Sequence, residues 1–139
     1  MLLLQAAASG SISKCQQLLA AGCDLGEKDE NGWTALRYAA FYGHPEVCQL
    51  LIAAGSDVRS RGEDGVTPLL SASDQGHAEV CQLLLTAGSD LEEKAHPTQF
   101  TPLHFAAING HQSLLQLLLS HKANVNSRNG IGSTPSPGR

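Results

Sequence analysis

Short apolar runs alternate with polar, glycine-containing segments along the whole chain. One stretch predicts two helices, over about 68–75 and 78–87, separated by a turn at Gly76-His77. Thr67 suits a helix N-cap, the proline after it suits the first helical position, and Gly88 can adopt the positive φ that closes a helix. Neither helix can bury its apolar face alone, so neighbouring pairs must stack. The polar segments between pairs favour β-hairpin fingers.

The same pattern recurs with a fixed period. A glycine precedes a histidine at Gly43, Gly76 and Gly110, with spacings of 33 and 34 residues. Two further sets of markers share these spacings, and they are Gly22, Gly55 and Gly88, and Thr34, Thr67, Thr101 and Thr134. Agreement among three independent markers indicates an internal repeat, which predicts a solenoid of stacked units.

The motif Thr101-Pro102-Leu103-His104-Phe105-Ala106-Ala107 resembles the hallmark of the ankyrin repeat family, and variants of it begin at Thr34 and Thr67. The resemblance covers nearly the whole chain. It implies an all-α ankyrin-repeat solenoid of four helix-turn-helix units with short β-hairpin fingers. The expected repeat domain is 1–127, in units of about 1–28, 29–61, 62–94 and 95–127, and an incomplete fifth unit with a flexible Ser/Pro/Gly tail occupies 128–139.

The two end units depart from the repeat pattern. Unit 1 has no finger, and Leu2, Leu3 and Leu4 are expected to give it an unusually apolar outer face. Unit 4 has Gln99 in place of the finger glycine and Lys122 in place of the glycine that closes the second helix. A residue other than glycine fits a left-handed helix end less well, so unit 4 should lose some stability.

Charge and composition narrow the classes of partner. The formal net charge is −4 and no basic stripe is visible, which argues against nucleic acid. No run approaches the roughly 18 apolar residues of a membrane span. We expect a cytoplasmic or nuclear protein that is a monomer or part of a larger chain, with no nucleic-acid and no membrane partner.

Histidines and cysteines invite a metal or redox interpretation. Three of the six histidines occupy one repeat position, which a structural role in the turns explains, and no His/Cys pair has zinc spacing, so we expect no metal and no cofactor. Cys15, Cys48 and Cys81 recur every 33 residues on successive second helices. Packed helices lie roughly 8–10 Å apart and a disulfide needs Cα atoms within about 7 Å, so these thiols should be buried and reduced. Cys23 should be more exposed and should react sooner.

Catalysis is not expected, because the sequence has no nucleophile–base pairing and no phosphate-loop motif. Asn126, in Asn124-Val125-Asn126, resembles the residue that asparagine hydroxylases modify in ankyrin repeats. An ordinary turn asparagine is the alternative interpretation.

The resemblance implies a protein-binding module (a scaffold, adaptor or inhibitor) whose concave surface is formed by inner helices and fingers. The residues expected on that surface are Glu30, Asn31, Trp33, Tyr38, Phe41, Tyr42, Arg59, Arg61, Glu63, Asp64, Asp74, Gln75, Phe100, Phe105, Ile108 and Asn109. Trp33, Phe41 and Tyr42 hold positions where the family places exposed residues, and aromatic anchors flanked by charge are typical of interface hot spots. The alternative is a small-molecule or nucleotide sensor in which Trp33 stacks on a ligand and Arg59 or Arg61 pairs with it.

Overall fold

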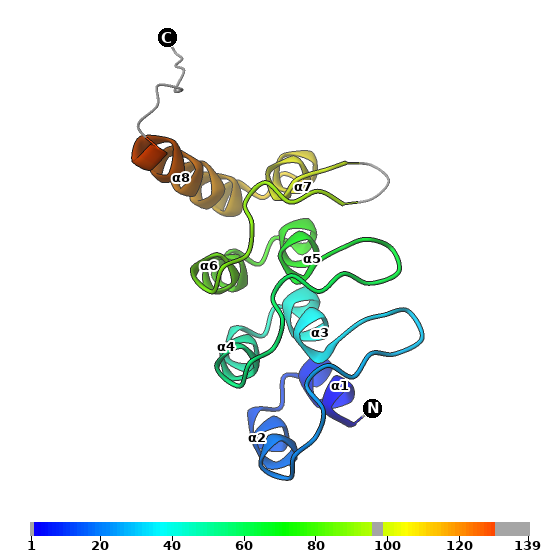
Figure 1. Cartoon of the computed structure of the whole chain (residues 1–139). Coiled ribbons are helices and arrows are strands. Elements are labelled where there is room, and N and C mark those ends of the chain that lie inside the picture. The colour runs from blue at the N-terminus through cyan, green and yellow to red at the C-terminus, as the bar shows by residue number, and fades with distance from the viewer. Residues whose placement is uncertain (1, 96–98, 130–139) are drawn as a thin grey trace.

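A computed structural model of the chain describes residues 2–95 and 99–129, with side chains as far as His121. Those residues form eight helices in two layers (Figure 1). The inner helices are α1 (Leu2–Ser9), α3 (Ala35–Tyr42), α5 (Pro68–Gln75) and α7 (Pro102–Asn109). The outer helices are α2 (Ile12–Ala20), α4 (Pro45–Ala53), α6 (Ala78–Thr86) and α8 (Gln112–Asn129). Helices stack on their counterparts within each layer, as the repeat predicts.

The ends of the inner helices follow from the motif residues. The hydroxyl of Thr67 accepts a hydrogen bond from the Leu70 amide at 3.2 Å, and a proline occupies the first turn of α5 and of α7. Gly76 closes α5 with a φ of 80°, in the left-handed region that favours glycine. Gly88, with a φ of 109°, follows the outer helix α6. The predicted caps are therefore confirmed.

The repeated Gly-His pairs lock adjacent units together. The Nε2 atom of His77 donates to the carbonyl of Phe41 at 2.9 Å, and His44 and His111 bind the carbonyls of Ala8 and Asp74 at 3.0 Å. Each imidazole lies against the glycine that ends the preceding inner helix, at Gly10, Gly43 and Gly76. A Cβ atom at these glycines would be only 2.5–2.7 Å from the ring. The histidines have the structural role that their periodicity predicts.

The core runs along the stack between the two layers. Cys15, Cys48 and Cys81 are fully buried and unpaired, and Cys23 is half-buried, as predicted. Burial raises the pKa of the Cys48 and Cys81 thiols to about 12.

One expectation from the sequence is wrong, and a second, the β-hairpin fingers, is not confirmed. Leu3 and Leu4 are buried in the core, and only Leu2, 65% exposed, faces outward. The fingers contain no strand within the described residues, because each is closed by isolated backbone bonds, such as Asp29 N to Trp33 O at 3.1 Å, rather than by a ladder. Outer helix α8 continues past Lys122 to Asn129. Of the predicted fifth unit and tail, 128–139, the first two residues belong to α8, and 130–139 lie outside the described residues, as do 96–98.

The described helices include none that is both long and apolar enough to cross a membrane.

Replacing Gly43 by alanine should destabilise the fold more than replacing Gly110. Both glycines have left-handed φ values, 75° and 72°, so each substitution strains the backbone by roughly 1–2 kcal/mol. At Gly43 the new methyl also meets the His77 ring, whereas at Gly110 nothing lies within 4 Å. We expect an additional loss of about 1–3 kcal/mol for Gly43→Ala, measured by urea unfolding. Equal losses for the two variants would show that the imidazole does not fill this space.

The order in which the cysteines react with a thiol reagent should follow how deeply each is buried. Cys23 should react with a thiol reagent in the native protein, whereas Cys48 and Cys81 should react only after unfolding, because reaction requires the thiolate and burial disfavours it. Mass spectrometry of peptides after timed labelling gives the order. Labelling of Cys48 before Cys23 would contradict the position of the outer helices.

Candidate functional site

The candidate residues from the sequence lie mainly where the fingers and the inner helices share one side of the solenoid (Figure 1). We call this side the inner surface. The exposed candidates are Glu30, Asn31, Tyr42, Arg59, Arg61, Glu63, Asp64, Gln75, Ile108 and Asn109. The half-buried candidates are Trp33, Tyr38, Phe41, Asp74, Phe100 and Phe105. None of these candidates is fully buried.

Four aromatic side chains of unit 2 form one cluster. The Trp33 ring lies 4.9 Å from that of Tyr38 and 5.4 Å from that of Phe41, between centroids. Phe41 in turn meets Tyr42 edge-to-face at 5.0 Å. These contacts half-bury Trp33 and Phe41, so the expectation that both are exposed is wrong. Tyr42, at the edge of the cluster, keeps 51% of its surface exposed.

Arg37 organises this cluster, although the sequence pattern does not reveal it. Its guanidinium carbon lies 3.9 Å from the centroid of the Trp33 ring, a cation–π contact, and the residue is only 4% exposed. Its nitrogens donate to both carboxylate oxygens of Asp64, each at 2.8 Å, and to the Ser71 hydroxyl at 2.8 Å. The hydrogen bonds from Arg37 hold the pKa of Asp64 below its ordinary value. Unit 2 is thereby joined to the finger and the inner helix of unit 3.

Asp29 fixes the base of the unit 2 finger. Its Oδ1 accepts hydrogen bonds from the amides of Asn31 and Trp33 at 2.9 and 3.0 Å, and its Oδ2 accepts one from the Tyr38 hydroxyl. Partial burial opposes ionisation, but these hydrogen bonds and the positive charge of Arg37 outweigh it and lower the pKa of Asp29. The same carboxylate raises the pKa of Tyr38 to about 12.

Arg59 and Arg61, which the sensor hypothesis places beside Trp33, form hydrogen bonds to other groups. Arg59 donates to the carbonyl of Gly88 at 3.0 and 3.2 Å. Arg61 donates to the carbonyl of Lys94 at 2.7 Å and also to that of Gly65. One face of Trp33 is covered by Arg37 instead. The geometry does not assemble the stacking-and-pairing site of the sensor hypothesis.

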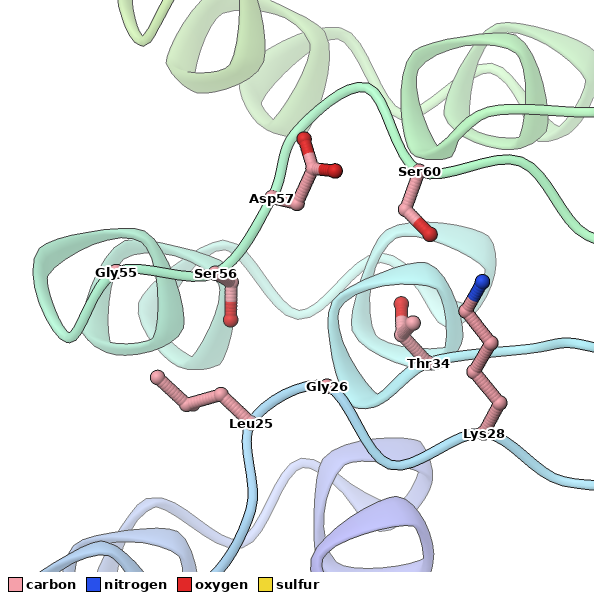
Figure 2. A pocket seen from close by; sticks show the side chains of 8 residues that line it. All are labelled: Leu25, Gly26, Lys28, Thr34, Gly55, Ser56, Asp57 and Ser60. Carbon is pink, nitrogen blue, oxygen red and sulfur yellow. The ribbon is translucent and has the colours of Figure 1, made fainter.

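A cavity of about 240 Å³ lies between the segments that follow α2 and α4 (Figure 2). Its lining includes Leu25, Lys28, Ser60 and Asp57, and the Lys28 side chain extends toward Ser60 of the next unit. The Ser56 hydroxyl beside it is buried without a hydrogen-bond partner. Both a cation, Lys28, and a carboxylate, Asp57, line this cavity, so no single charge dominates it.

The sequence also raised two other kinds of site, a hydroxylation site at Asn126 and a metal site. Asn126 lies within α8, not in the turn that the repeat pattern predicts, and its hydroxylation stays a prediction. Among the side chains that the structure describes, no three His, Cys, Asp or Glu residues gather closely enough to hold a metal ion.

Comparison with known families agrees with the stacked helix pairs. A family model described as ankyrin repeats (3 copies) matches residues 3–95, and a model described as ankyrin repeat matches residues 98–130. No curated protein matches the chain.

Asp64→Asn should destabilise the protein and should make its free energy of unfolding depend less on pH under acidic conditions. The lowered pKa of Asp64 means that its ion pair stabilises the fold above the ordinary aspartate pKa, about 3.9, and that this contribution disappears as the pH falls through and below that value. At pH 7 we expect a loss of about 1–2 kcal/mol, because Arg37 stays buried without its counter-charge. Urea unfolding between pH 7 and pH 3 measures both effects.

The matched control is Asp57→Asn. Asp57 is exposed, and its Oδ1 accepts a backbone hydrogen bond from Arg59 at 2.9 Å that an asparagine can also accept. It should change stability by less than about 0.5 kcal/mol. An equal effect of the two variants would assign no special role to the Arg37–Asp64 pair.

Proposed function

The chain belongs to the ankyrin repeat family, whose repeats are generally protein–protein interaction modules, and we propose that it binds a protein partner through its inner surface. A scaffold, an adaptor and an inhibitor would each act in this way without catalysis. The free, buried cysteines suit the cytoplasm or the nucleus, where thiols stay reduced.

One observation carries the choice of surface: Tyr42 is an exposed ring held in place by half-buried aromatic neighbours. Its edge-to-face contact with Phe41, which packs on Trp33, restricts the ring before any partner arrives. A preorganised aromatic side chain loses little conformational entropy on binding and buries a large area, which is why such residues dominate interface hot spots. Tyr42 is therefore the expected anchor.

The fingers of the inner surface carry exposed charge. The finger of unit 2 carries Glu30 and that of unit 3 carries Glu63, and the Glu63 amide donates to the Asn31 carbonyl at 3.0 Å, which brings the two finger tips together. Both carboxylates are exposed. Charged groups at an interface rim mainly set specificity and association rate, so this arrangement favours a partner with basic groups facing the fingers.

Tyr42→Ala should weaken partner binding by about 2 kcal/mol, or roughly 30-fold in Kd, while stability changes by less than about 0.5 kcal/mol. Trp33→Ala is a poorer test than the sequence suggested, because Trp33 is half-buried and contacts Arg37, so its loss should also destabilise the fold. The measurement is capture of proteins from lysate with the intact chain, followed by titration of the captured partner.

Gln49→Ala is the control, because Gln49 is exposed on outer helix α4. A specific partner should be retained by Gln49→Ala and lost by Tyr42→Ala. If Gln49→Ala abolishes capture and Tyr42→Ala does not, the partner binds the outer helices and the proposal is wrong.

A further inference from the structure

The junction between units 2 and 3 shows how the inner surface holds a cation. There the guanidinium of Arg37, on α3, lies against Asp64 of the next finger and the Ser71 hydroxyl of α5. The repeat of 33 residues places Leu4 of unit 1 at the position of Arg37, and it places Asn31 and Tyr38 of unit 2 at the positions of Asp64 and Ser71. The equivalent junction between units 1 and 2 therefore has no guanidinium of its own.

A cavity of about 240 Å³ occupies that equivalent junction, where α1 lies beside α3 (Figure 1). Its lining is Leu4, Gln5, Ala8, Asp29 and Tyr38. A water molecule takes about 30 Å³ of liquid volume, so the cavity has room for the end of a long side chain. Leu4 and Tyr38, which correspond to Arg37 and Ser71, both border it.

The carboxylate of Asp29 has only neutral hydrogen-bond donors among the described residues. Its Oδ1 accepts from two backbone amides and its Oδ2 from the Tyr38 hydroxyl, which fills three of its roughly four lone-pair positions. Arg37 is engaged by Asp64, and Lys28 extends toward Ser60 in the separate cavity of Figure 2. One acceptor position on Oδ2 remains, and Arg37 acts on the Asp29 charge through space without a hydrogen bond to it.

The rest of the lining suits an aliphatic stem that carries a cationic head. Leu4 and Ala8 are apolar, the Tyr38 ring can contact a cation through its face, and the exposed Gln5 supplies an amide oxygen as a second acceptor. A guanidinium has several N–H donors in a fixed plane and can bond Asp29 and Gln5 at once.

We propose that the cavity between α1 and α3 binds an arginine side chain of the protein partner, with the guanidinium on Asp29. The inference rests on the proposed function, because it supposes a partner on the inner surface. Tyr38 and Tyr42 lie four residues apart on α3 and so share a face of this helix. The arginine and the surface that Tyr42 anchors would belong to one interface.

The test uses Nα-acetyl-arginine amide as the probe, and Nα-acetyl-citrulline amide as its neutral counterpart of the same shape. Two-dimensional ¹H–¹⁵N NMR of the full chain should show saturable shifts at Gln5, Ala8, Asp29 and Tyr38 with the arginine probe. Citrulline should bind about tenfold more weakly or worse, because it cannot pair with the carboxylate.

Two variants test the site itself. Asp29→Asn, which can still accept the two finger amides, should reduce arginine binding about tenfold or more, whereas Asp57→Asn should not change it. Ala8→Leu fills the cavity without altering charge and should also abolish binding, so the proposal stays testable if Asp29→Asn fails to fold. The NMR spectrum of each variant reports its folding.

Equal binding of arginine and citrulline, or shifts centred on residues away from the cavity, would overturn the inference. The probe experiment needs no partner. If the probe fails while Tyr42→Ala still loses the captured protein, only the arginine site is excluded. If the probe binds and Tyr42→Ala has no effect on capture, the proposed surface fails instead.

Discussion

The structure depends on one contact that is repeated three times: an imidazole ring seated against a glycine and bonded to a carbonyl of the preceding unit. The ring takes the volume that a side chain at the glycine would need, and its N–H satisfies a carbonyl at the end of an inner helix that has no partner within that helix. Because the hydrogen-bond length varies only between 2.9 and 3.0 Å, successive inner helices meet in nearly the same way each time. The fingers and the inner surface are therefore arranged as regularly as the inner helices.

Arg37 adds a single irregular connection to this frame. A buried guanidinium is costly to desolvate, and here a carboxylate, a hydroxyl and an indole ring together offset that cost. The pair need not add net stability for its geometry to matter, because it fixes the Trp33 ring relative to the finger of the next unit. The position of the guanidinium against the Trp33 ring thus depends on residues of the next unit.

The sequence was sufficient to predict the repeat, the helix caps, the burial of the three recurring cysteines and the role of the histidines, since each depends on local chemistry or on spacing. It was insufficient for Arg37, because Asp64 and Ser71 lie 27 and 34 residues away and meet the guanidinium only after the units stack. The half-burial of Trp33 and the cavity at Asp29 have the same origin. The length of α8 escaped prediction for a different reason: a missing glycine removes a stop signal but does not say where the helix ends.

The carbonyls that accept the imidazoles belong to Ala8, Phe41 and Asp74, whose side chains are a methyl group, an aromatic ring and a carboxylate. Backbone atoms thus support the stack at positions where the side chain differs from unit to unit. In the proposed function, support and recognition would therefore use different atoms of the same residue. A chain built in this way could change the side chains of its proposed binding surface while the architecture beneath them stays the same.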